Sequence, residues 1–235
     1  TCKCWAIYTK DYNLLMKILG IIPARGGSRG IPKKNIKLLN GKPLIAYTIE
    51  ASLSSKLDRV VVSTDCEEIA EVSRRYGAEV FMRPSELAKD NTPTLPVLQN
   101  VALNTNECFD AIMTLQPTSP LWTAKHIDES IKLFVDDRSA DSLVSVIKVP
   151  HNFMPEKLMT ISGQYISGDT EPKRRQDTSL MYARNGAAIY ITKFKKIEEY
   201  IFGGNILPYF MGKIESIDID DLEDWELVEK IINSN

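Results

Sequence analysis

The sequence predicts an α/β fold in which a mostly parallel, mixed sheet is flanked by helices on both faces. Short β-rich runs alternate with helical segments of about 10–15 residues, which is the pattern of βαβ units. The chain has 235 residues, 43% hydrophobic and 26% charged, which is enough for one large domain with an ordinary core. No apolar run reaches the roughly 20 residues that a membrane-spanning helix needs, which excludes such a helix.

The elements are expected in a regular order from Lys17 onward, and proline and glycine mark several of their ends. Pro43 suits the first turn of a helix, and Gly77 is a common type of helix stop. The predicted strands cover 17–22, 59–64, 78–82, 111–115, 142–149, 186–191, 206–209 and 213–217, and the predicted helices cover 43–53, 66–76, 96–105, 124–135 and 222–232.

Two segments depart from this pattern. Thr1–Leu15 has no clear period, and we expect it to be a leader or an appended extension ahead of the domain that covers 16–235. Over 150–185 the periodicity fades while Pro, Gly, Asp and Arg collect. Such a segment inside a domain is more typical of a functional or partner-binding excursion than of a plain loop.

Composition excludes several classes of function. Lys plus Arg total 29 against 31 for Asp plus Glu, so the net charge of −2 argues against a non-specific nucleic-acid binder. The four cysteines are too few and too scattered for a disulfide scaffold, and a reducing cytoplasm is the expected location. The only two histidines, His126 and His151, lie apart in the sequence, which makes a histidine-based metal site an unfavoured hypothesis.

The segment 24–35, directly after the first strand, has the composition of a phosphate-binding loop. Glycines let backbone N–H groups wrap an anion, and arginine and lysine neutralise its oxygens, so this density of both suits a triphosphate. The Walker and Gly-x-Gly-x-x-Gly patterns are absent, which counts against ATPases and dehydrogenases. A solvated basic turn is the alternative. The glycines and cations are Gly26, Gly27, Gly30, Arg25, Arg29, Lys33 and Lys34.

Asp218 and Asp220 stand two residues apart near the end of the chain. On a strand this spacing would point both carboxylates to one face while Ile217 and Ile219 face the core. Two carboxylates on one face can hold Mg²⁺, which also takes waters and substrate phosphates as ligands. The alternative is a polar strand edge that leads into the acidic segment 220–224.

Six segments in order resemble the N-acylneuraminate cytidylyltransferases (CMP-sialic acid synthetases), a family that includes CMP-legionaminic and CMP-pseudaminic acid synthetases. The resemblance covers nearly all of 16–235 and implies a nucleotide-diphospho-sugar-transferase-like (Rossmann-like) fold. It also implies Mg²⁺-dependent transfer of a cytidylyl group from CTP to a nine-carbon keto sugar acid, with release of pyrophosphate. The matching segments are 24–35, 62–65, 83–87, 115–121, 184–187 and 216–220.

The resemblance also implies roles for individual residues. Arg25, Lys34, Asp218 and Asp220 are the expected catalytic group, and the two aspartates are the expected Mg²⁺ ligands. The expected nucleotide-binding residues are Ala24, Gly26, Gly27, Ser28, Arg29, Asn35 and Arg83, of which Asn35 and Arg83 would contact the base. The expected sugar-binding residues are Gln116, Thr118, Ser119, Lys157, Arg175, Gln176 and Asn185.

The same resemblance implies a homodimer, in which segment 150–185 is an arm that reaches to the second subunit. One residue departs from the family pattern: Trp122 stands where arginine is usual, which favours a different nonulosonic acid or an altered ion pair. Two rival functions stay open. One is nucleotidyl transfer with another nucleoside triphosphate or sugar, and the other is a binding protein without turnover.

Overall fold

The computed structural model describes residues 16–28, 30–168, 180–185 and 188–234. Its centre is an eight-stranded mixed sheet with the strand order β10-β7-β11-β6-β1-β4-β5, in which β12 pairs with β7. The strands are β1 (Ile18–Pro23), β4 (Arg59–Thr64), β5 (Glu79–Met82), β6 (Ala111–Leu115), β7 (Ser142–Lys148), β10 (Tyr182–Arg184), β11 (Ile189–Lys193) and β12 (Ile206–Phe210). Strands β6, β1, β4 and β5 are parallel neighbours, while β11 runs antiparallel to both β6 and β7.

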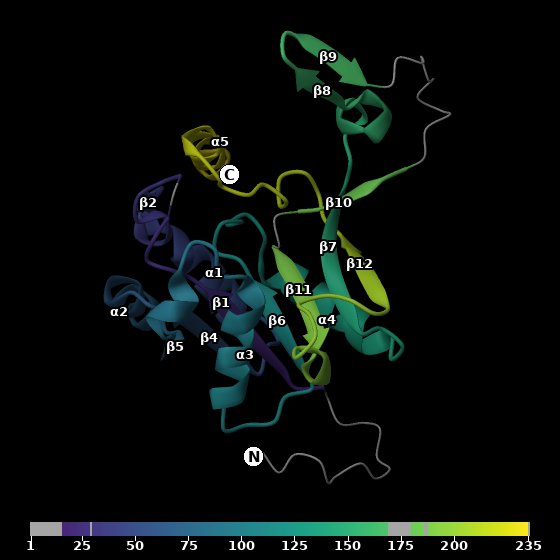
Figure 1. The fold of residues 1–235 in the computed structure, drawn as a ribbon. Coiled ribbons are helices and arrows are strands. Elements are labelled where there is room, and N and C mark those ends of the chain that lie inside the picture. Colours follow the sequence, from purple (N-terminus) through teal and green to yellow (C-terminus); the bar gives the residue numbers. More distant parts are fainter. Residues whose placement is uncertain (1–15, 29, 169–179, 186–187, 235) are drawn as a thin grey trace.

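Helices cover both faces of this sheet, as predicted (Figure 1). Strand β1 is buried on both sides: Ile18 and Ile22 pack in one core cluster, and Leu19 and Ile21 pack in another. The first cluster contains residues of α1 (Leu44–Leu53), α2 (Glu67–Arg75) and α4 (Ala124–Asp136), and the second contains residues of α3 (Thr94–Asn104). This continuous apolar pattern is typical of a central parallel strand.

The last helix, α5 (Leu222–Asn233), begins at Asp221, whose side chain accepts hydrogen bonds from the N–H groups of Glu223 and Asp224. It packs in a third cluster with Leu39 of the short strand β2 (Leu38–Leu39), which pairs with β3 (Lys42–Pro43). Ile31 and Ile219 are both buried in this cluster. Helix α5 therefore packs against the segment after β1, which contains Ile31, and against the segment just before the helix, which contains Ile219.

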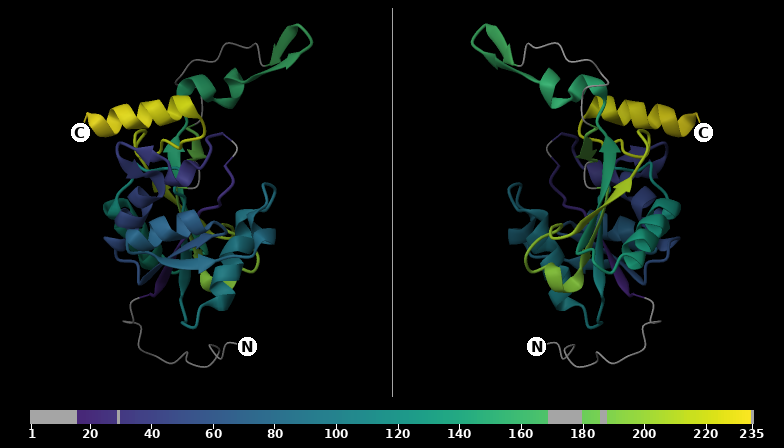
Figure 2. Two further views of the ribbon diagram at one scale, coloured as in Figure 1. Left: turned by 90° about the vertical axis from the view of Figure 1, so that its left-hand side faces the viewer. Right: turned by 90° about the vertical axis from the view of Figure 1, so that its right-hand side faces the viewer.

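Residues 151–168 form an arm that extends away from the body (Figures 1 and 2). The arm contains two short 3-10 helices, His151–Phe153 and Pro155–Lys157, and the antiparallel hairpin of β8 (Met159–Ser162) and β9 (Tyr165–Gly168). All eight residues of β8 and β9 are exposed. The sequence analysis marks this segment as irregular, and its hairpin was not predicted.

The predicted strand over 213–217 is wrong. Residues 213–216 form a turn, which is closed by a hydrogen bond of 3.2 Å from the N–H of Ile217 to the carbonyl oxygen of Ile214. The backbone groups here are satisfied locally instead of by a neighbouring strand. The other predicted elements are confirmed with small shifts at their ends, while Thr1–Leu15 lies outside the described residues.

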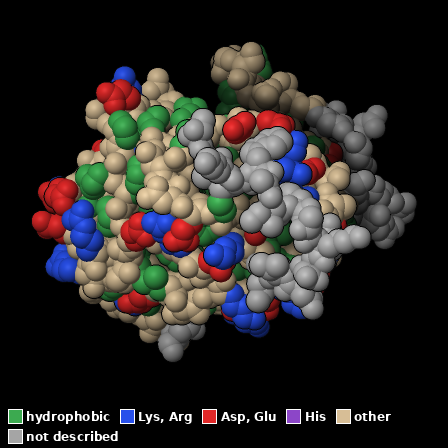
Figure 3. Space-filling view, turned by 90° about the horizontal axis from the view of Figure 1, so that it is seen from below, with side chains coloured by type: hydrophobic (Ala, Val, Ile, Leu, Met, Phe, Trp, Pro, Cys, Tyr) green, Lys and Arg blue, Asp and Glu red, His purple; other side chains and the backbone are tan. Residues whose placement is uncertain are grey.

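The charged side chains are mixed over the surface, in agreement with the small net charge of −2. Seen from below, lysine and arginine lie close to aspartate and glutamate across the described part of this face (Figure 3). Among the described helices, none combines the length and the apolar composition that crossing a bilayer requires.

Candidate active site

The glycine-rich loop after β1 is held against the end of β4. The N–H of Ala24 donates to the carbonyl oxygen of Ser63 at 2.9 Å, and the N–H of Gly26 donates to Oδ1 of Asp65 at 3.0 Å. Asn35 then donates from Nδ2 to the carbonyl oxygen of Arg25 at 3.1 Å. These bonds place the loop at the carboxyl ends of the parallel strands, where ligands of such sheets bind.

The two adjacent lysines of the loop point to different partners. Lys33 has a left-handed backbone, with φ of 51°, and its ammonium pairs with Glu68 of α2 at 2.7 Å. Lys34 instead donates from Nζ to the carbonyl oxygen of Ile219 at 2.6 Å, across 185 residues of sequence. The basic loop and the acidic pair therefore meet at Lys34, as the sequence analysis requires.

Gly30 shows how closely the two segments approach. A Cβ atom at position 30 would lie 2.4 Å from the backbone carbonyl oxygen of Asp220, a distance that real Cβ atoms do not tolerate. A side chain here would push the acidic segment away, because the clashing atom belongs to the backbone. Glycine at this position therefore permits the contact between the loop and the acidic pair.

We expect Gly30→Ala to lower the melting temperature by about 2–12 °C, because such overpacking costs about 1–3 kcal/mol in a domain of this size. Thermal unfolding followed by circular dichroism measures this. Gly27→Ala is the matched control, since an added Cβ there would meet no atom within 4 Å. The close approach would be contradicted if Gly30→Ala melted like the unchanged protein.

Asp218 is the more enclosed member of the acidic pair. Ser119 donates from Oγ to Oδ1 of Asp218 at 2.9 Å, and the N–H of Ile219 donates to the carbonyl oxygen of Thr118 at 2.8 Å. Burial raises the pKa of Asp218, hydrogen bonds from Thr118 and Ser119 oppose this, and the charge of Asp220 raises it further. The two carboxylates are thus close enough to repel each other, while the Lys34 charge favours the ionised form of Asp218.

Arg83 and Asn35, which the resemblance assigns to the base, are 7% and 6% exposed. Among the described residues, Nε of Arg83 and Oδ1 of Asn35 have no hydrogen-bond partner. Nη2 of Arg83 lies 3.6 Å from Oδ1 of Asp65, and burial lowers the pKa of Arg83 while the Asp65 charge opposes that change. A buried donor and a buried acceptor without partners suit a ligand with complementary polar edges.

Arg25, in the loop after β1, is paired with Asp90. Its Nη1 lies 2.7 Å from Oδ1 of Asp90, in the segment between β5 and α3. The charge of Arg25 also lowers the pKa of Arg83, so the two guanidinium groups are close enough to repel each other. Neither Asp65 nor Asp90 was assigned a role from the sequence, because a lone aspartate does not reveal which cation it will face.

The loop after β6 carries the residues that were predicted to contact a sugar. Ser119 is buried, while Gln116 and Thr118 are half-buried. The predicted sugar contact Asn185 is 4% exposed, and its side chain already has partners: its Oδ1 accepts from Ser145 at 2.6 Å and its Nδ2 donates to Ser216 at 3.0 Å. Asn185 therefore connects β7 to the segment just before Asp218.

The remaining predicted site residues do not join this group. Lys157 is exposed on the arm, in the 3-10 helix Pro155–Lys157. Arg29, Arg175 and Gln176 lie outside the described residues. Trp122 is 3% exposed and packs in the core cluster that contains Ile18 and Ile22.

Sequence reasoning missed an aromatic cluster beside Asp218. The guanidinium carbon of Arg184 lies 4.7 Å from the ring centroid of Phe202, and Phe202 contacts Tyr190 edge to face at 5.3 Å. Burial raises the pKa of Tyr190, Arg184 opposes this, and the charge of Asp218 contributes to the increase. Only the tertiary fold brings these residues together, although the predicted segment 184–187 contains Arg184.

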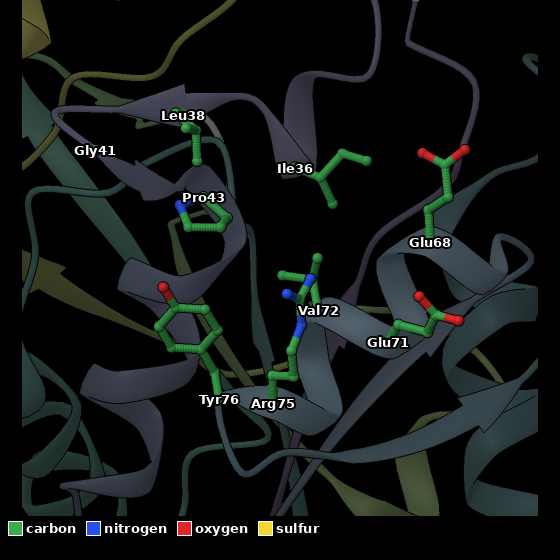
Figure 4. Close-up of a pocket in the computed structure, with 9 residues that line it drawn as sticks. All are labelled: Ile36, Leu38, Gly41, Pro43, Glu68, Glu71, Val72, Arg75 and Tyr76. Atoms are coloured by element: carbon green, nitrogen blue, oxygen red, sulfur yellow. The ribbon is translucent and has the colours of Figure 1, made fainter.

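A cavity of about 690 Å³ lies elsewhere, between the β2–β3 hairpin and α2. Figure 4 shows Leu38 and Pro43 on one side of it and Val72 on the other, and no predicted site residue lines it. A smaller cavity of about 300 Å³ touches Gly26 and Gly27 of the loop. This smaller cavity is thus lined in part by residues of the predicted nucleotide site.

A family model described as cytidylyltransferase matches residues 19–227. The chain belongs to the cytidylyltransferase family. The resemblance that the motifs predicted is thereby confirmed, and the basic loop and acidic pair described above are parts of a cytidylyltransferase fold.

Named relatives of this cytidylyltransferase act on sugar acids. The chain is 36% identical to CMP-N,N'-diacetyllegionaminic acid synthase of Legionella pneumophila, over 94% of this chain and 98% of the relative. It is 35% identical to N-acylneuraminate cytidylyltransferase of Escherichia coli, over 90% of this chain but only 51% of the relative. The chain thus spans about half the length of the second relative and nearly all of the first.

The fold also has a counterpart among solved structures. A CMP:2-keto-3-deoxy-manno-octonic acid synthetase in complex with CTP matches with a TM-score of 0.72, over 93% of this chain and 99% of that one. The sequence identity is 18%, so this match concerns the fold alone. It confirms the predicted α/β class, with a mostly parallel sheet flanked by helices.

Proposed function

We propose that this cytidylyltransferase joins a nonulosonic acid to CTP, giving the CMP-sugar and pyrophosphate. The observation that carries the proposal is the contact of 2.6 Å between Nζ of Lys34 and the carbonyl oxygen of Ile219. This contact sets a cationic, glycine-lined loop beside a pair of carboxylates at the ligand edge of the sheet. The names of the two sugar-acid relatives support the sugar class.

Charge neutralisation and alignment are what the transfer needs, because phosphoryl chemistry depends little on covalent help from the protein. Arg25 and Lys34 would neutralise triphosphate oxygens, and the N–H groups of the loop beyond Gly26 would line the same cradle. The anomeric hydroxyl of the sugar would attack the α-phosphorus as pyrophosphate leaves on the opposite side. The unpartnered polar atoms of Asn35 and Arg83 would meet the base.

Mg²⁺ is the metal that the site suits best. Asp218 and Asp220 offer two neighbouring carboxylates, and Mg²⁺ usually binds through one or two carboxylates plus substrate phosphates and water. Among the residues that the structure describes, no group of three His, Cys, Asp or Glu side chains forms a complete metal cage. The set fits an ion that arrives with the nucleotide, and such an ion supplies a Lewis acid for phosphate oxygens.

The sugar acid would bind between the β6–α4 loop and the aromatic cluster of Arg184, Phe202 and Tyr190. Gln116 and Thr118 offer neutral hydrogen-bonding groups. Arg184 is exposed and stacked on Phe202, and its fork of N–H donors suits a carboxylate. Lys157, on the arm, would contribute from the second subunit of a homodimer.

The arm supports that homodimer, because an isolated two-stranded hairpin with an apolar face is marginally stable in water. Ile161 and Ile166 are directly opposite in the hairpin and are 78% and 62% exposed. We expect the double variant Ile161→Ser, Ile166→Ser to be monomeric, as measured by analytical ultracentrifugation. The variant Thr160→Ala, Ser167→Ala changes the adjacent pair, which points to the other face, and should leave the dimer intact. A dimeric Ile161→Ser, Ile166→Ser variant would contradict the arm's role.

The proposed reaction is tested by pyrophosphate release and by mass spectrometry of the product. The protein is incubated with Mg²⁺, each of the four nucleoside triphosphates, and a panel of nine-carbon keto acids. We expect a CMP-sugar to form with CTP and no nucleotide sugar to form with the other three nucleoside triphosphates. A preference for another nucleotide would overturn the cytidylyl assignment, and CTP binding without any pyrophosphate release would identify a binding protein.

A further inference from the structure

Among the described residues of the proposed nucleotide site, Arg25 and Arg83 are each paired with an aspartate, but the two pairs differ in burial. The Arg83 side chain is 4% exposed and lies 3.6 Å from Asp65, while the Arg25 side chain is 32% exposed and lies 2.7 Å from Asp90, which is 46% exposed. Removing the partner of a buried charge is costly, whereas an exposed ion pair contributes little net free energy. Arg83 should therefore keep its partner, and Arg25 can exchange it.

The side chain of Arg25 can exchange its partner, whereas the backbone around Arg25 is held by hydrogen bonds. Its carbonyl oxygen accepts a hydrogen bond from Asn35 at 3.1 Å, and the N–H of the next residue, Gly26, is held by Asp65 at 3.0 Å. A guanidinium uses the same N–H donors for carboxylate and for phosphate oxygens. The Asp90 carboxylate consequently occupies a donor of Arg25 that a triphosphate would need.

The position of Asp90 is set locally by turns in the segment that follows Arg83. The N–H of Leu87 donates to the carbonyl oxygen of Pro84 at 3.0 Å, and the N–H of Thr92 donates to that of Lys89 at 3.0 Å. These bonds do not involve Arg25. The carboxylate can thus stay near Arg25 after the ion pair opens, and it can pair again once the ligand has left.

We propose that Asp90 is an exchangeable counterion of Arg25, which the triphosphate of CTP displaces and which pairs with Arg25 again as pyrophosphate leaves. The proposal rests on the proposed function, in which Arg25 binds the triphosphate. Asp90 competes with both CTP and pyrophosphate for Arg25. It therefore lowers the affinity for CTP and also makes the release of pyrophosphate easier. Asp65, by contrast, is a positioning residue that holds Gly26 and Arg83 throughout.

Asp90→Asn tests the exchange, since it removes the competing charge and keeps the side-chain shape. Isothermal calorimetry with CTP in the absence of sugar should show binding about two- to five-fold tighter, the range that an exposed ion pair allows. The inhibition constant for inorganic pyrophosphate should fall by a similar factor. Asp65→Asn is the matched control and should change CTP binding in the opposite direction, because buried Arg83 loses its partner.

Arg25→Ala separates the exchange from the proposed function. In an Arg25→Ala background, Asp90→Asn should no longer tighten CTP binding. An equal tightening in that background would overturn the proposal, because the effect of Asp90 would then not act through Arg25. The proposal also fails if Arg25→Ala weakens CTP binding while Asp90→Asn leaves it unchanged or weaker. If Arg25→Ala itself leaves CTP binding intact, the role of Arg25 in the proposed function is refuted, and the exchange with it.

Discussion

Replacing Asp218 by asparagine should lower kcat/KM on the order of 10³-fold, the largest loss that we expect from a single substitution. A metal ion bound to phosphate oxygens supplies several kcal/mol of charge stabilisation, and each 1.36 kcal/mol corresponds to a factor of ten. Asparagine still offers an oxygen to the Oγ of Ser119, so the local hydrogen bond of 2.9 Å can persist. The loss would therefore follow from the missing charge.

Two measurements accompany this prediction. Pyrophosphate release at increasing Mg²⁺ concentration should show that Asp218→Asn needs more metal than the unchanged protein, and removal of metal with a chelator should abolish turnover in both. Glu223→Gln removes one negative charge from an exposed position on α5 and is the matched control, with turnover expected to stay unchanged. An Asp218→Asn variant with full turnover at low Mg²⁺ would exclude this carboxylate as a metal ligand.

The fold was predictable because its central strands are apolar on both sides. Strand β1 has Ile18 and Ile22 for one core and Leu19 and Ile21 for the other, so its pattern leaves little choice but the middle of a covered sheet. The place of the site followed from the same rule, since ligands bind at the carboxyl ends of parallel strands. The contact of Lys34 with the carbonyl oxygen of Ile219 brings the two predicted parts of the site together, while the ligands that bind there stay a prediction.

What the sequence could not supply are the pairings that depend on backbone conformation and on distant partners. The left-handed backbone of Lys33 decides that one lysine contacts α2 and the other contacts Ile219, and neither residue type reveals it. The segment before Asp218 alternates like a strand but forms a turn, in which the N–H of Ile217 donates to the carbonyl oxygen of Ile214. Periodicity records which residues are apolar, not which neighbour satisfies the backbone.

The difference between the two lysines leads to the second large effect. Lys34→Met should lower kcat/KM about 10²–10³-fold, the range that is typical when one positioned donor to a developing negative charge is removed. The substitution removes the charge that favours the ionised form of Asp218 and the donor to the carbonyl oxygen of Ile219. Both the affinity for CTP and the rate of the chemical step should fall, because the triphosphate is already charged when it binds and further negative charge develops on the leaving pyrophosphate during transfer.

Lys33→Met is the control that only the structure provides, because the two residues are neighbours in sequence and carry the same charge. Its side chain is 66% exposed and its ammonium is paired with Glu68, so losing it should change kcat/KM less than about threefold. Single-turnover kinetics with CTP and calorimetric titration would separate binding from chemistry in both variants. Equal losses in Lys33→Met and Lys34→Met would mean that the loop acts through its total charge, and the specific contact between Lys34 and the acidic segment would then carry no catalytic role.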